Sequence, residues 1–180
     1  MRITEIEVAR TVGLSYCGRQ GFAATLPALC GFLGGILGGI ISDRILKSSG
    51  SLTLARKIPI VAGMLLSTVI IVCNFVDGAV VVVAFIALAF FGKGIGSLGW
   101  AVVSDTSPRL APGLNAGLFN TFGNVAGITT PIAIGYIVKA SGGSFAGALV
   151  FVALNALLAL VCYLFIVGRI ERVELVDRAS

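Results

Sequence analysis

The chain has 180 residues, of which 57% are hydrophobic, 12% are charged and 24 are glycine, and its formal net charge is +5. These proportions exclude a disordered chain and leave too few polar residues to coat a soluble globule. With no histidine and four widely spaced cysteines, the sequence offers no histidine-based acid–base chemistry and no zinc-type cluster. We therefore expect no metal site, no cofactor and no enzyme. The basic charge follows a membrane pattern rather than one typical of nucleic-acid binding.

Five long stretches that are almost free of charge predict transmembrane helices. A bilayer core of about 30 Å needs about 20 helical residues, and none of the stretches alternates like a barrel strand. The expected fold is therefore an all-α polytopic membrane protein of about five spans, between an atypical N-terminal segment (1–20) and a cytoplasmic tail (169–180). The expected spans are 21–42, 58–76, 78–104, 113–138 and 142–168.

Lysine and arginine set the expected orientation. Eight basic residues lie in the first loop, the third loop and the C-terminal tail, and one lies in the second and fourth loops together. The positive-inside rule then puts the first group and the C-terminus in the cytoplasm. The basic N-terminal segment conflicts with this orientation. It indicates a fragment that lacks upstream helices, with a truncation or frameshift at its start; the alternative is a five-helix protein with a translocated tail.

Small residues recur at every fourth position in the first and fourth spans, which places them on one helix face. Such faces let helix backbones approach closely in lipid. They predict either static packing or a sliding surface in a transporter. The residues are Gly31, Gly35 and Gly39 in the first span, with Gly34 and Gly38 beside them, and Gly123, Gly127, Pro131 and Gly135 in the fourth.

Polar residues inside the spans are candidates for substrate binding. Lys93 lies midway along the third span, where a charge is costly, so it indicates either contact with an anion or a structural ion pair. Ser97 and Trp100 follow on the same helix, although a tryptophan near a span end is often an interfacial anchor. Asn120 and Asn124 share one face of the fourth span, which favours either a polar lining or interhelical hydrogen bonds.

The acidic residues all lie in tails, loops or span ends. A proton-coupled carrier normally has an intramembrane carboxylate. If the chain belongs to such a carrier, its proton site lies elsewhere. The absence of an intramembrane acid pair and of a nucleophile–base constellation also argues against a membrane enzyme.

The end of the first span carries a loop motif. Gly39, Asp43, Arg44 and Lys47 resemble the G-x-x-x-D-R-x-x-[KR] motif of the major facilitator superfamily, and the resemblance implies a cytoplasmic gate. The stretches 50–60, 90–108 and 117–131 look like the C-terminal half of bacterial anion:cation symporters. Within that branch they most resemble carriers of sugar acids such as D-galactonate, D-glucarate and galactarate.

This resemblance implies that the five spans are the eighth through twelfth of a twelve-helix carrier in the bacterial inner membrane. Such a carrier imports a small anionic sugar acid with protons by alternating access, and its substrate sits at the midplane between two halves. The expected partners are the substrate, protons, the lipid bilayer and the missing N-terminal half. Two rivals remain: a truncated, non-transporting remnant, and a small oligomeric assembly subunit or channel.

Overall fold

The computed structural model describes residues 3–76, 78–109 and 111–173, with the helix backbone alone for residues 3–24. All regular elements of this part of the chain are helical. Five helical stretches are long and apolar enough to cross a membrane, which confirms the predicted fold class. The elements are α1 (Ile3–Ser49), α2 (Leu52–Ser67) with its 3-10 continuation η1 (Thr68–Asn74), α3 (Ala79–Ile95), α4 (Gly99–Thr106), α5 (Pro112–Ala140), α6 (Ala146–Val161) and the π-helical turn η2 (Cys162–Ile166).

The helix bounds differ from the expected spans near the N-terminus, in the expected first loop and within the expected third span. The α1 helix runs through residue 20 without a break, and its apolar part is Thr25–Ser49. The expected first loop is almost entirely helical, because only Gly50 and Ser51 separate α1 from α2. Gly50 has a φ of +64°, which suits glycine, and the Ser51 hydroxyl accepts a hydrogen bond from the Leu54 N–H at 3.4 Å. Charges that we expected in a loop therefore lie on helix ends.

The expected third span consists of two helices. The α3 helix ends at Ile95 and α4 begins at Gly99. Gly92, Gly94, Gly96 and Gly99 surround the break, and glycine weakens a helix by about 1 kcal/mol per residue relative to alanine. The Ser97 hydroxyl donates to the Gly94 carbonyl at 2.7 Å and so satisfies one carbonyl near the end of α3.

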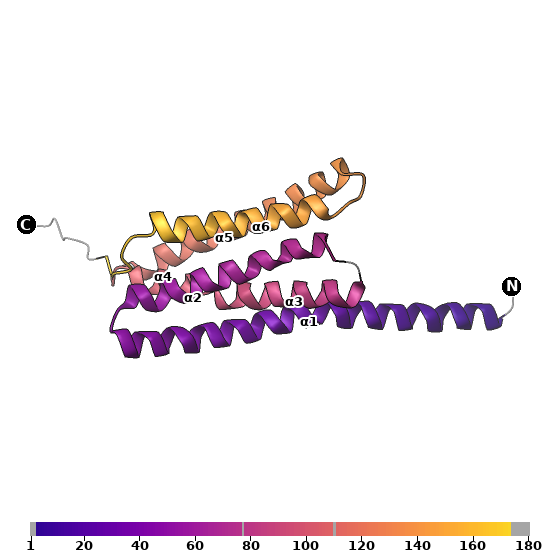
Figure 1. Cartoon of the computed structure of the whole chain (residues 1–180), viewed down its shortest axis with the longest axis horizontal. Helices are drawn as coiled ribbons and strands as arrows, with labels where there is room; N and C mark the ends of the chain where they lie inside the picture. Colours follow the sequence, from indigo (N-terminus) through magenta and orange to yellow (C-terminus); the bar gives the residue numbers. More distant parts are fainter. Residues whose placement is uncertain (1–2, 77, 110, 174–180) are drawn as a thin grey trace, which may run out of the picture.

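The spans form two groups (Figure 1). The α1, α2 and α3 helices pack side by side, and the antiparallel α5–α6 hairpin lies on one side of them. A small core of Ile70, Ala89 and Ala153 joins η1, α3 and α6. The N-terminal part of α1 extends past the other helices (Figure 1).

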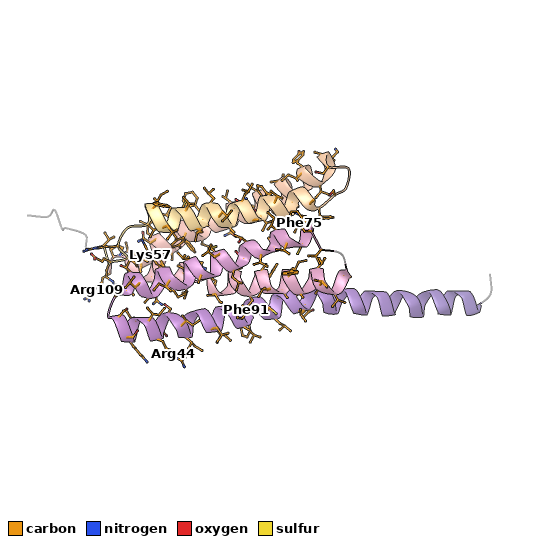
Figure 2. The ribbon with its side chains drawn as sticks, viewed as in Figure 1. Arg44, Lys57, Phe75, Phe91 and Arg109 are labelled. Atoms are coloured by element: carbon orange, nitrogen blue, oxygen red, sulfur yellow. The ribbon has the colours of Figure 1, made fainter. Side chains whose placement is uncertain are left out.

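Glycines bring α3 into direct backbone contact with α1 and α2. A Cβ on Gly38 would lie 2.7 Å from the Ile95 carbonyl oxygen of α3, and a Cβ on Gly34 would collide with the carbonyl oxygen of Phe91 (labelled in Figure 2). On the α2 side, a Cβ on Gly92 would lie 2.9 Å from the Gly63 carbonyl oxygen. The predicted packing residues Gly31 and Gly35 also lie in this seam, because a Cβ on Gly94 would collide with the Gly31 carbonyl oxygen and lie 2.8 Å from the Gly35 nitrogen.

The α5 helix has a different environment. None of its described residues is buried. A Cβ on Gly123 or Gly127 would meet no described atom within 4 Å, and Pro131 is exposed. The described structure therefore shows no helix packed against these three residues, and their role in helix packing stays a prediction.

Candidate functional site

Lys93 lies on the face of α3 that faces neither neighbouring helix. Gly92 and Gly96 approach α2, and Gly94 approaches α1. Lys93 and Ser97, in contrast, are exposed. The Lys93 ammonium lies 5.7 Å from the centroid of the Phe90 ring, within reach of a cation–π contact. Among the described residues, Lys93 makes no ion pair. The chain therefore presents a positive charge on an open apolar helix face.

The two predicted asparagines lie on α5. Asn120 and Asn124 are exposed, and the Asn124 side chain donates to the Asn120 carbonyl oxygen at 2.9 Å. This contact is internal to the helix, and the described contacts do not join either residue to Lys93. The amide oxygen of each side chain remains available to a ligand or to another helix.

Trp100 joins the α3–α4 break to α5. Its ring contacts Phe119 edge-to-face, with centroids 4.9 Å apart and planes at 76°. Gly99 lies beside the same ring, since a Cβ there would be 3.1 Å from Phe119 Cζ. Trp100 is nevertheless 53% exposed. The indole therefore contacts Phe119 while about half of the Trp100 surface stays exposed.

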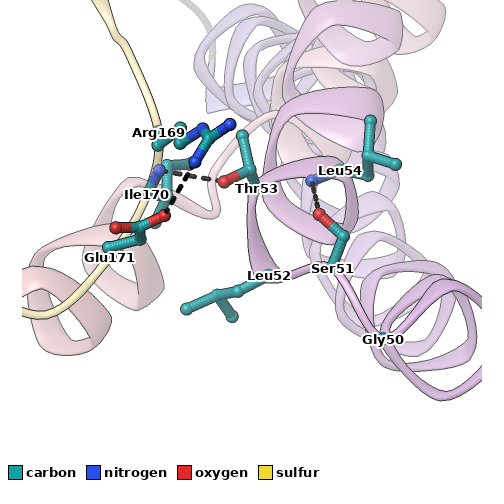
Figure 3. A pocket seen from close by; sticks show the side chains of 8 residues that line it. All are labelled: Gly50, Ser51, Leu52, Thr53, Leu54, Arg169, Ile170 and Glu171. Carbon is teal, nitrogen blue, oxygen red and sulfur yellow. Dashed lines mark hydrogen bonds and ion pairs between the residues drawn. The ribbon is translucent and has the colours of Figure 1, made fainter.

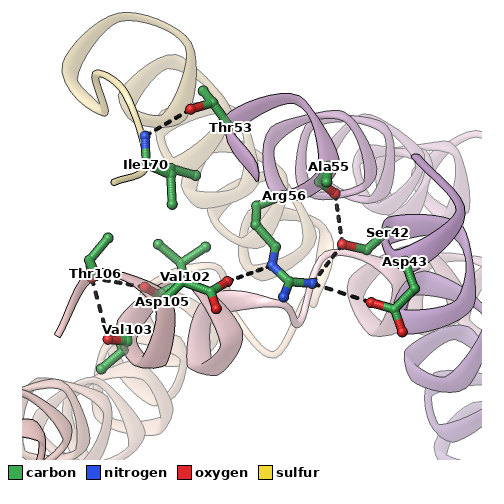
Figure 4. A network of polar contacts seen from close by, with 10 residues as sticks. All are labelled: Ser42, Asp43, Thr53, Ala55, Arg56, Val102, Val103, Asp105, Thr106 and Ile170. Carbon is green, nitrogen blue, oxygen red and sulfur yellow. Dashed lines mark hydrogen bonds and ion pairs between the residues drawn. The ribbon is translucent and has the colours of Figure 1, made fainter. Parts of the chain in front are cut away.

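A polar network closes one end of the bundle (Figure 4). Arg56 of α2 donates to Asp105 of α4 at 2.7 Å and to the Ser42 hydroxyl of α1 at 2.7 Å. Ser42, which is fully buried, donates in turn to the Ala55 carbonyl oxygen at 2.8 Å. Asp43 lies farther away, at 3.9 Å from the guanidinium. We call Ser42, Asp43, Arg56 and Asp105 the Arg56 hub; it connects three helices through one cation.

The hub differs from the predicted loop motif. Of the four motif residues, the structure brings only Asp43 to the hub. Arg44 and Lys47 are exposed without an ion pair among the described residues, and Gly39 faces open space. The sequence analysis counted Arg56 among the basic residues of the first loop and Asp105 among the acidic residues at span ends, and it gave neither a role in a site. A signal for this ion pair was present in the sequence. Arg56 precedes the second expected span and Asp105 follows the third, so the two opposite charges lie on the same predicted side of the membrane.

A shallow pocket lies beside the hub, at the start of α2. Its volume is about 520 Å³, and residues 50–54 and 169–171 line it (Figure 3). Arg169 and Glu171 form an exposed pair at 4.0 Å on its rim. No local pattern predicts this pocket, because its two walls are more than 100 residues apart in the chain.

Comparison with known proteins identifies the family. The family model of the Major Facilitator Superfamily matches residues 7–179. The chain is 66% identical over 155 residues to the probable galactarate/D-glucarate transporter GudP of Bacillus subtilis, and 59% identical over 157 residues to the protein of the same name from Escherichia coli K12. It is 39% identical to the D-galactonate transporter of Escherichia coli O6:H1.

These alignments cover 86%, 87% and 86% of this chain, but only 34%, 35% and 36% of the relatives. The chain thus spans about a third of the length of the curated relatives it matches. Its five apolar spans agree with a multi-pass membrane protein. The sequence match and the helical architecture together show that this chain belongs to the Major Facilitator Superfamily.

Proposed function

We propose that this chain is the C-terminal part of a carrier that imports galactarate, D-glucarate or a related sugar-acid anion together with protons, by alternating access. The 66% identity to a protein named as a probable galactarate/D-glucarate transporter carries the proposal. The remaining helices of the carrier would correspond to the part of the relatives that this chain does not cover.

Lys93 would contact a carboxylate of the substrate. A sugar diacid carries negative charge at both ends, and an intramembrane lysine usually faces a ligand, a cavity or a partner charge. Lys93 is exposed, lies on the open face of α3, and is followed by a break in the helix. Interrupted transmembrane helices often form substrate sites in transporters, because they expose backbone polar groups.

The other predicted residues would bind the remainder of the substrate. Asn120 and Asn124 can hydrogen-bond hydroxyl or carboxylate groups, and the Ser97 hydroxyl can accept a hydrogen bond while it donates to Gly94. The exposed part of the Trp100 ring would pack on the carbon chain of the sugar acid.

The Arg56 hub would belong to the cytoplasmic gate. The carrier would lie in the bacterial inner membrane with its C-terminus in the cytoplasm. Supporting this orientation, the basic residues Arg44, Lys57 and Arg109 gather at the end of the bundle that holds the hub (Figure 2). The described acidic residues lie at span ends or beyond them, so the proton-binding carboxylate would come from the missing half.

A fused carrier tests the proposal. The chain is joined to the preceding two thirds of the Bacillus subtilis relative and expressed in cells without galactarate uptake. We expect proton-dependent uptake of radiolabelled galactarate. Replacing Lys93 by alanine should lower uptake at least about tenfold, because a charge-assisted contact contributes about 1.5–3 kcal/mol. Lys139→Ala, at the far end of α5, is the matched control and should leave uptake unchanged.

Unchanged uptake by an expressed Lys93→Ala carrier would remove this lysine from the site. A correctly inserted fusion without any uptake would favour the remnant, in which this chain has lost the ability to transport. Purification of the unfused chain as a discrete, stable dimer would instead favour the oligomeric subunit.

A further inference from the structure

The segment that follows the last helix crosses the hub end of the bundle. Val167 has an extended backbone conformation, and residues 167–173 form no regular secondary structure. The Val167 carbonyl oxygen accepts a hydrogen bond from the Lys57 ammonium, and the Ile170 N–H donates to the Thr53 hydroxyl at 3.0 Å. The Val173 N–H donates to the Thr106 carbonyl oxygen at 3.1 Å. We call Val167–Val173 the strap; it attaches to both α2 and α4.

Ile170 anchors the strap. It is 1% exposed, while its neighbour Arg169 is exposed to solvent and lines the pocket of Figure 3. Ile170 is the single buried residue of the strap, since residues 168, 169 and 171–173 are all exposed. Burial of this aliphatic side chain stabilises the attachment of the strap in addition to its hydrogen bonds.

The strap and the Arg56 hub hold the same two helices. On α2, Thr53 and Lys57 bind the strap, and Arg56 between them binds α4. On α4, Asp105 binds the hub, and the adjacent Thr106 binds the strap (Figure 4). Elsewhere in the described structure α2 and α4 have few close approaches. Contact between them at this end therefore depends on the hub and the strap together.

The α4 helix is otherwise weakly held. None of its residues is buried, and the break at residues 96–98 separates it from the tightly packed α3. Its remaining ring contact is Trp100 with Phe119 of α5. A short helix with a break at one end and polar attachments at the other can pivot once the attachments open, because breaks of this kind absorb the backbone change.

We propose that the strap is a latch: seated, Ile170 keeps α4 against α2, and the latch opens together with the Arg56 hub. Two attachments that share one movable element are coupled, so weakening either one weakens the other. The hub and the strap thus have two joint states at this end of the bundle: closed, with both attachments formed, and open, with both released. The latch concerns the fold of this chain and does not depend on sugar-acid transport.

The test measures the exposure of position 170 in the full chain. The four native cysteines are replaced, Ile170→Cys or Arg169→Cys is introduced, and the purified chain in lipid nanodiscs is labelled with a water-soluble maleimide. We expect Ile170→Cys to react at least about tenfold more slowly than Arg169→Cys, since labelling of a seated side chain waits for local opening. Equal rates would overturn the latch, because they would show that position 170 is not seated.

Coupling is tested by adding Asp105→Asn or Thr53→Val to each cysteine chain. Asp105→Asn breaks the hub without touching the strap, and Thr53→Val removes one strap hydrogen bond without touching the hub. Either should raise the labelling of Ile170→Cys at least about threefold and leave Arg169→Cys unchanged. If Asp105→Asn leaves the Ile170→Cys rate unchanged, the strap is static and the latch is wrong. Should Asp105→Asn fail to insert, Ser42→Ala removes the hydrogen bond between α1 and Arg56 instead. Faster labelling of Ile170→Cys would then support the latch, and an unchanged rate would overturn it.

Discussion

The glycines of α1 and those of α5 have the same spacing but opposite surroundings. Gly34 and Gly38 bring α1 onto the backbone of α3, whereas Gly123 and Gly127 face no described atom within 4 Å. Four-residue spacing creates a smooth helix face, which permits close approach in lipid. It does not specify a partner, and among the described residues the α1 face has one whereas the α5 face has none.

A leucine in each face would show the difference most strongly. Gly34→Leu should prevent the chain from folding or destabilise it by at least about 3 kcal/mol, since overpacking alone costs about 1–3 kcal/mol and here the side chain would strike backbone. Gly123→Leu is the matched control and should change stability by less than about 0.5 kcal/mol. Monodisperse yield and thermal unfolding in detergent measure both. A folded, stable Gly34→Leu chain would contradict the α1–α3 seam.

The Arg56 hub should give the next largest effect. The Arg56 side chain is 13% exposed, so Arg56→Ala leaves Asp105 without its partner and should cost about 2–3 kcal/mol. Arg44→Ala, on an exposed side chain nearby, should cost less than about 0.5 kcal/mol. Denaturant unfolding of the two variants compares them. Equal small losses would mean that the hub contributes no net stability.

The Trp100–Phe119 contact is the described ring contact that holds α5 to the break beside α3. Its coupling free energy, measured by the double-mutant cycle of Trp100→Leu and Phe119→Leu, should be about 0.5–1.5 kcal/mol. The single variants serve as the internal control. Zero coupling would show that α5 is attached to the rest of the chain by the α6 hairpin instead.

The smallest stability effect should come from α5 itself. Asn124→Ala removes an exposed hydrogen bond within one helix and should change stability by less than about 0.5 kcal/mol. In the fused carrier, the same variant should raise the galactarate concentration needed for half-maximal uptake, because the substrate would lose the hydrogen bond that the Asn124 amide provides. A large loss of stability with normal uptake would reverse the assignment and make Asn124 a packing residue.

Much of the fold was predictable because it follows from the apolar lipid that surrounds the chain. Five stretches that are almost free of charge, each about as long as the bilayer core is thick, leave helices as the means of satisfying their backbone hydrogen bonds. The break within the third span was not predicted, although its four glycines were visible. The glycines show that a helix can break near these positions. The residue at which α3 ends depends in addition on its packing against α1 and α2, which the sequence does not show.

The candidate site likewise contains residues that the sequence predicted and residues that it did not. Lys93 was singled out from the sequence because a charge within an apolar span is costly, and that cost does not depend on the fold. The Arg56 hub and the strap were missed, since their members come from positions such as Ser42, Arg56, Asp105 and Ile170 that are far apart in the chain. No local pattern links such residues.

The sequence by itself determined the helical membrane class, the approximate spans and the family, because hydrophobic length, charge placement and long local motifs are properties of the chain. Only the tertiary structure decided which glycine face has a partner, which carboxylate pairs with Arg56 and where the strap lies. Each of these depends on the approach of distant segments, and such approach is set by the packing of side chains against whole helices rather than by neighbours in sequence.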